Sequence, residues 1–338
     1  MDAGLSVTVG PLHLKNPVMA GSGEATMDRD GIRAAVDAGA AAVVAKSTNE
    51  SGVAAEQLAA AEYVLLDDRW EPLPWGPAPR SATLFNRSGL PSVDFDQWAE
   101  LLADLDRHAQ RMNSYVVPSL IVSDPGEAAR RAKDFEAAGL RWLELNVGAP
   151  HAQEAVAGAI RAASTPTAVS ELVRPIREAV SIPLTVKLGG DIDAVEASAT
   201  AISAGADAVC LSGRYMGFVP DLASRRPVLG TFGAVGGAWA LPMTLRSIAK
   251  VRHFLGPDVP VIGTNGARDG RDVARFLLAG ASAVQMTTAV MTEGPAALTR
   301  AIEELAKYLG EQDTDAAGII GDAADNVMTY EQAMREQP

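Results

Sequence analysis

The chain has 338 residues, 48% of them hydrophobic, and a formal net charge of −13. Such an acidic chain is not expected to bind nucleic acid, because nucleic-acid-binding proteins concentrate Lys and Arg. Its one cysteine, Cys210, excludes an internal disulfide framework and a cysteine-held iron–sulfur cluster. No signal peptide opens the chain and no apolar run approaches the roughly 18 residues of a membrane helix. We therefore expect a cytoplasmic protein with no membrane segment.

The first predicted element is a β-hairpin, formed by residues 5–9 and 12–14 on either side of Gly10-Pro11. After it, hydrophobic periodicity predicts eight strands, each followed by a helix. Eight such units predict a (β/α)8 TIM barrel, with a doubly wound open sheet as the alternative. The strands are expected near residues 17–21, 41–46, 114–122, 142–147, 183–188, 207–212, 259–264 and 282–287. The helices are expected near residues 29–38, 98–111, 125–138, 167–180, 192–204, 242–255, 270–279 and 295–308.

A repeated helix ending supports the parallel arrangement. Four helical stretches end in Ala-Gly and are followed at once by a β-rich run, and Gly fits the left-handed conformation that closes a helix. Such repeats are typical of βα units around a parallel sheet. The four pairs are Ala38-Gly39, Ala138-Gly139, Ala204-Gly205 and Ala279-Gly280.

Four segments are additional to the eight strand–helix units of the barrel. Residues 47–97 and 213–240 are too long for simple connections, so we interpret both as lid insertions over the site. The hairpin is expected to cap the opposite end of the barrel. Residues 310–338 are expected to form a C-terminal extension with a loop and a short helix. The sequence thus predicts one domain over residues 1–338 of α/β class.

Lysines end two of the predicted strands. Lys187 lies in the apolar run Leu184-Thr-Val-Lys187, where an unpaired charge is costly to bury. No anionic residue adjoins it in sequence, which favours a ligand that carries negative charge. Lys46 ends the second strand and is either a site residue or a solvated loop lysine. The small residues Ala20 and Gly21 end the first strand, either to admit a flat ligand or as an ordinary turn.

The last two strands end in a pattern typical of a phosphate site. Gly266 and Ala267 follow strand seven ahead of a helix, and Thr287 and Thr288 follow strand eight. In barrels, backbone N–H groups and a helix N-terminus at this position hold phosphate. A phosphorylated substrate or cofactor is therefore expected. The alternative is that these residues form ordinary glycine turns, which have the same sequence pattern.

Several spaced motifs resemble the dihydroorotate dehydrogenase family of FMN flavoproteins and the flavin domain of dihydropyrimidine dehydrogenases. The resemblance covers roughly residues 5–308. The motifs are Asn16-Pro-Val-Met-Ala-Gly-Ser22, Asn86-Arg-Ser-Gly-Leu-Pro91, Leu143-Glu-Leu-Asn146, Gly233-Ala-Val-Gly-Gly237, Ile262-Gly-Thr-Asn-Gly266, Val284-Gln-Met-Thr-Thr288 and Glu293-Gly-Pro295.

The resemblance implies FMN bound non-covalently at the barrel mouth. Its ring edge would meet Lys187, where a buried cation stabilises the reduced, anionic flavin. Its phosphate would lie on Gly266, Ala267, Thr287 and Thr288. The rest of the implied cofactor-binding set is Ala20, Gly21, Lys46, Asn146, Gly236, Gly237 and Asn265.

The sequence departs from the family where the proton is moved. The family places a Cys or Ser three residues after the strand-end Asn, but here the run reads Asn146-Val-Gly-Ala149-Pro-His151, and alanine moves no proton. We predict that the catalytic residues are Lys187, Asn146 and His151. His151 would exchange the proton, since its unperturbed pKa suits that task, or would only orient the substrate.

The substrate side is predicted from the same departures. Of the family's amide ring, Asn86 and Asn146 remain, and Arg87 and Arg214 are candidate anchors for an anion. Losing polar partners disfavours dihydroorotate, because a site built for hydrogen bonds discriminates through them.

We therefore expect an FMN-dependent oxidoreductase that acts on a CH–CH or C=C bond of another small polar substrate. The alternatives are a true dihydroorotate dehydrogenase with a replaced base, a flavin-binding protein without turnover, and a flavin-free barrel that binds a phosphorylated substrate. An electron-transfer partner protein is possible, and the resemblance implies a homodimer.

Overall fold

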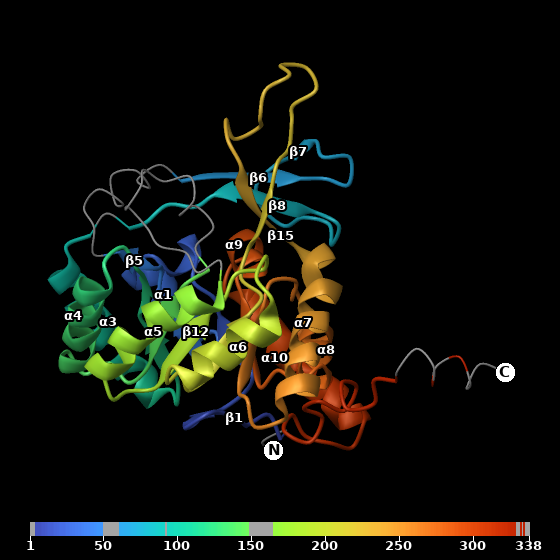
Figure 1. The fold of residues 1–338 in the computed structure, drawn as a ribbon. Coiled ribbons are helices and arrows are strands. Elements are labelled where there is room, and N and C mark those ends of the chain that lie inside the picture. Colours follow the sequence, from blue (N-terminus) through green and yellow to red (C-terminus); the bar gives the residue numbers. More distant parts are fainter. Residues whose placement is uncertain are drawn as a thin grey trace.

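The computed structural model describes residues 4–49, 61–91, 93–148, 165–328, 332 and 334. Its largest feature is a parallel sheet curled into a barrel, with the N-terminus at one end and an antiparallel sheet over the other (Figure 1). The parallel strands are β3 (Val18–Ala20), β4 (Ala42–Val44), β5 (Thr48–Asn49), β9 (Tyr115–Val117), β10 (Ser119–Ile121), β11 (Leu143–Asn146), β12 (Leu184–Lys187), β13 (Ala208–Leu211), β16 (Val261–Thr264) and β17 (Ala283–Met286).

The barrel closes through one interrupted strand. The sheet runs in the order β5-β10-β11-β12-β13-β16-β17-β3-β4-β9, so β9 and β10 lie near its two ends. These two are consecutive in sequence and flank Pro118, which has no N–H to donate. The carbonyl oxygen of Val117 accepts from Ala45, and that of Pro118 accepts from Glu144. One chain segment thus joins both ends, which confirms the predicted TIM barrel.

Helices cover the outside of the barrel in the order that the sequence predicted (Figure 1). Aspartates accept a backbone hydrogen bond at the N-termini of five of them, as N-caps do. The helices are α1 (Arg29–Asp37), α3 (Phe95–Arg111), α4 (Pro125–Ala137), α5 (Pro166–Ala179), α6 (Ala194–Ser203), α7 (Leu241–Leu255), α8 (Gly270–Leu278) and α10 (Ala296–Glu311). Over the described ranges, none of the helices combines the length and apolar character needed to cross a membrane.

Each predicted Ala-Gly ending is confirmed as a helix stop. The glycines have positive φ angles of 97° at Gly39, 96° at Gly139, 103° at Gly205 and 108° at Gly280. That conformation is strained for residues with a side chain, so glycine lets the chain turn directly into the next strand. Within the described ranges, three short helices were not predicted, namely η1 (Glu24–Thr26), η3 (Ala238–Ala240) and α9 (Thr288–Glu293).

The predicted hairpin is confirmed below the barrel. Strands β1 (Val7–Val9) and β2 (Leu12–Leu14) pair antiparallel, and their four apolar side chains are buried. The C-terminal extension packs at the same end, where the Gly321 N–H donates to Leu277 at the end of α8 and Arg252 pairs with Asp325.

The two predicted lid insertions form one sheet rather than two separate covers. Its order is β14-β15-β8-β6-β7, all antiparallel, and it lies across the open end of the barrel (Figure 1). We call it the lid sheet. Its strands are β6 (Glu62–Leu66), β7 (Pro72–Leu73), β8 (Thr83–Arg87), β14 (Tyr215–Gly217) and β15 (Gly233–Gly236).

Candidate active site

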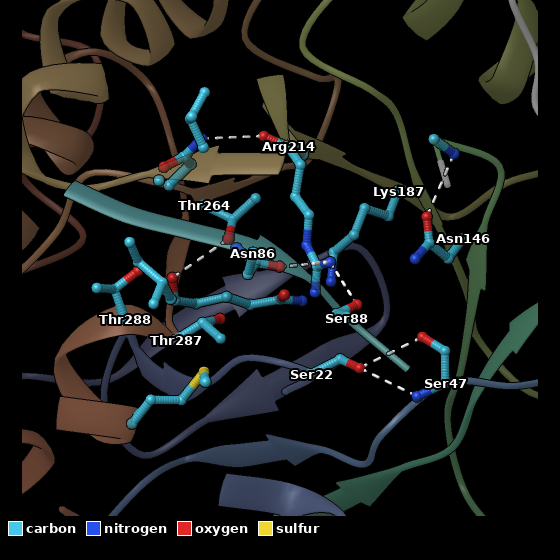
Figure 2. Close-up of a pocket in the computed structure, with 18 of the residues that line it drawn as sticks. Ser22, Ser47, Asn86, Ser88, Asn146, Lys187, Arg214, Thr264, Thr287 and Thr288 are labelled. Atoms are coloured by element: carbon cyan, nitrogen blue, oxygen red, sulfur yellow. Dashed lines mark hydrogen bonds between the residues drawn. The ribbon is translucent and has the colours of Figure 1, made fainter. Parts of the chain in front are cut away.

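A cavity lies between the carboxyl ends of the barrel strands and the lid sheet. It measures about 1190 Å³ with its open mouth included, large enough for a cofactor and a small substrate. In Figure 2, Thr287 and Thr288 lie on one side, Asn146 lies on the other, and Lys187 and Arg214 lie between them. The predicted site residues that line the cavity are Lys46, Asn86, Asn146, Lys187, Arg214, Gly236, Gly237, Asn265, Gly266, Ala267, Thr287 and Thr288.

Lys187 has an anionic partner within the protein, which corrects the inference drawn from its sequence neighbours. Its Nζ atom lies 2.9 Å from Oε1 of Glu144, which is on the adjacent strand β11. Both side chains are buried, at 8% and 1% exposure. The charge of Lys187 alone therefore does not require a negatively charged ligand.

Lys46 is also a buried, paired lysine rather than a solvated loop residue. It forms an ion pair with Glu24 of η1 and is 4% exposed. Burial lowers the pKa of Lys46 to about 8, against the opposing effect of Glu24, and the Arg214 charge lowers it further. One carboxylate oxygen of Glu24, Oε2, is buried without a hydrogen-bond partner among the described residues.

The predicted phosphate site presents free donors. The backbone N–H groups of Gly237, Gly266, Ala267 and Thr288 donate to no acceptor in the described ranges. Thr288 is the first residue of α9, so its N–H points out of the helix start. The Thr287 and Thr288 hydroxyls likewise have no partner in the part of the chain that the structure describes. This arrangement suits a phosphate group.

The glycines at this end keep the cavity open. A Cβ atom on Gly266 would lie 2.7 Å from the backbone of Leu241, and the residue has a φ of +117°. A Cβ on Gly236 would stand 3.5 Å from the Thr288 hydroxyl, inside the space between the predicted phosphate donors. A side chain at either position would therefore strain the backbone or occupy the cavity.

Ala20 and Gly21 were predicted to lie close to a ligand. Neither residue lines the cavity in the structure. Ala20 is fully buried. A Cβ on Gly21 would meet Thr287 Oγ1 at 2.2 Å. Gly21 therefore makes room for Thr287.

Arg214 reaches into the cavity and is held by the lid sheet. Its Nη1 donates to Oδ1 of Asn86 at 3.3 Å and to the hydroxyl of Ser88 (Figure 2). Both acceptors are neutral, and no carboxylate in the described ranges pairs with Arg214. A guanidinium in a cavity with only neutral partners is suited to binding an anion.

Arg87, the other predicted anchor, lies elsewhere. Successive residues of a strand point to opposite faces, and Asn86 already faces the cavity. Arg87 pairs with Glu62 at 3.3 Å and does not line the cavity. The structure therefore places Arg87 outside the cavity, and of the two predicted anchors Arg214 is the one that reaches it.

The predicted proton-transfer stretch is only partly described. Asn146 lines the cavity, and its Oδ1 accepts from the Gly148 N–H at 3.2 Å, while its amide nitrogen donates to no described residue. Ala149 and His151 lie outside the described residues, so the predicted role of His151 stays a prediction. The described residues contain no cluster of three or more His, Cys, Asp or Glu side chains suited to a metal ion.

Three functional candidates escaped the sequence analysis. Gln285 donates from Nε2 to Glu144 at 2.7 Å, and its buried Oε1 has no partner in the described ranges. The Tyr63 hydroxyl is also buried without a partner there, on the strand position opposite Asn86. Alternation in Leu143-Glu-Leu-Asn146 could have revealed Glu144, because it puts Glu144 on the same face as Asn146.

The family model and the curated relatives that match this chain all point to one family. A family model described as dihydroorotate dehydrogenase matches residues 75–309. The catalytic subunit of dihydroorotate dehydrogenase B (NAD(+)) from Geobacter sp. (strain M21) is 32% identical over 244 residues, which is 70% of this chain and 76% of that protein. The putative dihydroorotate dehydrogenase A (fumarate) from Solibacter usitatus is 32% identical over 322 residues, covering 91% and 94%. The dihydroorotate dehydrogenase B catalytic subunit from Pyrococcus abyssi is 29% identical over 311 residues, covering 91% and 95%.

Proposed function

Because this chain belongs to the dihydroorotate dehydrogenase family, we propose that it is an FMN-dependent oxidoreductase acting on a CH–CH or C=C bond of a small anionic substrate other than dihydroorotate. The family assigns an oxidoreductase. The observation that carries the proposal is the cavity beneath the lid sheet, with free phosphate donors on one side and Lys187, Asn146 and Arg214 across it.

The residues present fit FMN. A phosphate could accept hydrogen bonds from the N–H groups of Gly237, Gly266, Ala267 and Thr288, which are unpaired within the described part of the chain. The buried Oε1 of Gln285 lacks a donor in the described ranges, and an N–H on the edge of a flavin ring is a donor of the kind it needs. Lys187 lines the cavity, and its cation would stabilise the negative charge that a bound flavin gains on reduction. When bound, FMN would supply the two-electron acceptor or donor.

The chain's own residues would position the substrate. Arg214 binds an anionic group, and the lid residues Asn86 and Ser88 hold the guanidinium in place. Asn146 offers its amide nitrogen as a donor. The lid sheet covers these groups and limits access of water, which strengthens each charge interaction. His151 remains our proposed proton donor or acceptor, with Lys187 and Asn146 as the other catalytic residues.

Dihydroorotate is the second candidate substrate. It is favoured by the names of the relatives, which are dihydroorotate dehydrogenases. It is disfavoured by Ala149, because alanine cannot take the proton that a Cys or Ser base removes in other members of the family.

The relatives' names give two electron acceptors, NAD(+) and fumarate, so an electron-transfer partner and a small-molecule acceptor are both proposals for this chain. We also propose a homodimer, which sedimentation would test.

An anaerobic reduction screen tests the function. The purified protein is expected to carry flavin absorbance near 450 nm, and small unsaturated carboxylates or their saturated forms should oxidise or reduce that flavin. Dihydroorotate is tested alongside as the second candidate. Protein that neither contains FMN nor takes it up would refute the cofactor. Rapid bleaching by dihydroorotate, with no faster compound in the screen, would establish the second candidate instead. Bound flavin that no compound reduces would indicate a binding protein without turnover.

A further inference from the structure

The Lys187–Glu144 ion pair is buried at the mouth of the barrel. Glu144 is 1% exposed and accepts hydrogen bonds from three strands. Oε1 accepts from Lys187 at 2.9 Å and from the Ser119 hydroxyl at 3.0 Å, while Oε2 accepts from Gln285 at 2.7 Å. A carboxylate with three donors is well enough satisfied to stay charged while buried.

Two of these donors line the cavity. Lys187 and Gln285 both border it, whereas Glu144 lies behind them and does not. A ligand in the cavity therefore meets the cation of Lys187 with an anion directly behind it. At an effective dielectric far below that of water, the second charge cannot be neglected.

On the premise of the proposed function, we propose that Glu144 is a positioning residue that sets the balance between the oxidised and reduced forms of the bound flavin. It holds Lys187 and Gln285 toward the cavity, and its charge offsets part of the positive field of Lys187. Reduction adds negative charge to the flavin, so a full, unopposed cation would favour the reduced form more strongly than this pair does.

A change at Ser119 is expected to shift the flavin reduction potential in the direction opposite to a change at Glu144. The Ser119 hydroxyl donates to Glu144 and so offsets part of the carboxylate charge. The Ser47 hydroxyl, which lines the cavity, lies 2.8 Å from the Ser119 hydroxyl. Removing the Ser119 hydroxyl should therefore disfavour reduced flavin, whereas removing the Glu144 charge should favour it. A merely structural role for Glu144 would not give shifts of opposite direction.

The experiment measures the reduction potential of bound FMN by equilibration with redox dyes, in the full-length protein. Glu144→Gln keeps the shape and removes the charge, and we expect it to favour reduced over oxidised FMN by about tenfold, equivalent to about 30 mV for a two-electron couple. Ser119→Ala is expected to shift the potential downward by a smaller amount. Glu127→Gln, at an exposed position on α4, is the matched control and should leave it unchanged.

The outcomes separate the two proposals. Wild-type protein that binds no FMN overturns the proposed function. Wild-type protein that binds FMN, with potentials in Glu144→Gln and Ser119→Ala that stay at the wild-type value or move together, overturns the role of Glu144 alone. If Glu144→Gln does not fold, Ser119→Ala decides the question, because an unchanged or raised potential in that variant contradicts the proposal.

Discussion

Arg214 Nη1 lies 3.3 Å from Oδ1 of Asn86, although the two residues are 128 positions apart in the sequence. This contact joins the two insertions that form the lid sheet and places the guanidinium in the cavity. Since the partners of Arg214 in the described ranges are neutral, its charge is available to a ligand.

Replacing Arg214 by Gln should weaken binding of the anionic substrate about 10- to 100-fold, because a hydrogen bond to a charged group contributes roughly 1.5–3 kcal/mol. The Michaelis constant should rise while FMN affinity stays at the wild-type value. Arg87→Gln is the matched control, since Arg87 follows Asn86 on strand β8 but does not line the cavity. A Michaelis constant that responds to Arg87→Gln and not to Arg214→Gln would reverse the assignment.

Thr288→Val should weaken binding of FMN about tenfold and leave binding of riboflavin unchanged. The hydroxyl is expected to contact the phosphate, which riboflavin lacks. Fluorescence titration of the apoprotein with both compounds measures the difference. Thr299→Val, at an exposed position on α10, should change neither value. Equal losses for FMN and riboflavin would place the phosphate elsewhere.

The lowered pKa of Lys46 predicts a pH-dependent stability. Its pKa of about 8 in the folded protein lies below the ordinary 10.5, so unfolding takes up a proton between these two values. The contribution of Lys46 to the free energy of unfolding should therefore rise with pH across that window, by ~3 kcal/mol in full. Below pH 8 it should be constant.

Denaturant titrations from pH 7 to 10 would measure this dependence. Lys46→Met should flatten the rise, because the group that titrates is removed. Lys307→Met, a variant of an exposed lysine on α10, should keep the wild-type slope. The prediction does not survive if Lys46→Met and the wild-type protein show parallel curves.

Tyr63→Phe should separate stability from ligand binding. The buried hydroxyl makes no hydrogen bond of normal geometry in the described ranges, although Glu24 and Ser88 lie close enough to affect its pKa, so removing it should change the free energy of unfolding by no more than about 1 kcal/mol. Burial also raises the pKa of Tyr63, which keeps the hydroxyl protonated and able to donate. Substrate affinity should fall several-fold. A clear loss of stability in the ligand-free variant would mean that the hydroxyl serves the fold.

The barrel was predictable because its signals are local. Each Ala-Gly ending and each apolar run lies within one βα unit, so the sequence predicted all eight strands to within a few residues. The lid sheet was not predictable in the same way. Its pairing of Asn86 with Ala234 joins residues 148 positions apart, and no alternation within either insertion specifies the partner.

The site was predictable where it depends on backbone turns and less so where it depends on charge. Gly266, Thr287 and Thr288 were expected together because they follow neighbouring strands. The pairing of Lys187 with Glu144 was not predicted, because the partner lies on the adjacent strand, 43 residues away in the sequence. Parallel register brings Asn146 level with Lys187, and Glu144 is two residues earlier on the same inward face.

The shared lid sheet also constrains how relatives can diverge. Strands β8 and β15 exchange backbone hydrogen bonds, so a change of length in one insertion displaces the pairing of the other. Two stretches that are far apart in the gene must then vary together when a new substrate is acquired. A chimera that takes one insertion from a relative without the other would inherit a mismatched strand pair rather than half of a new specificity.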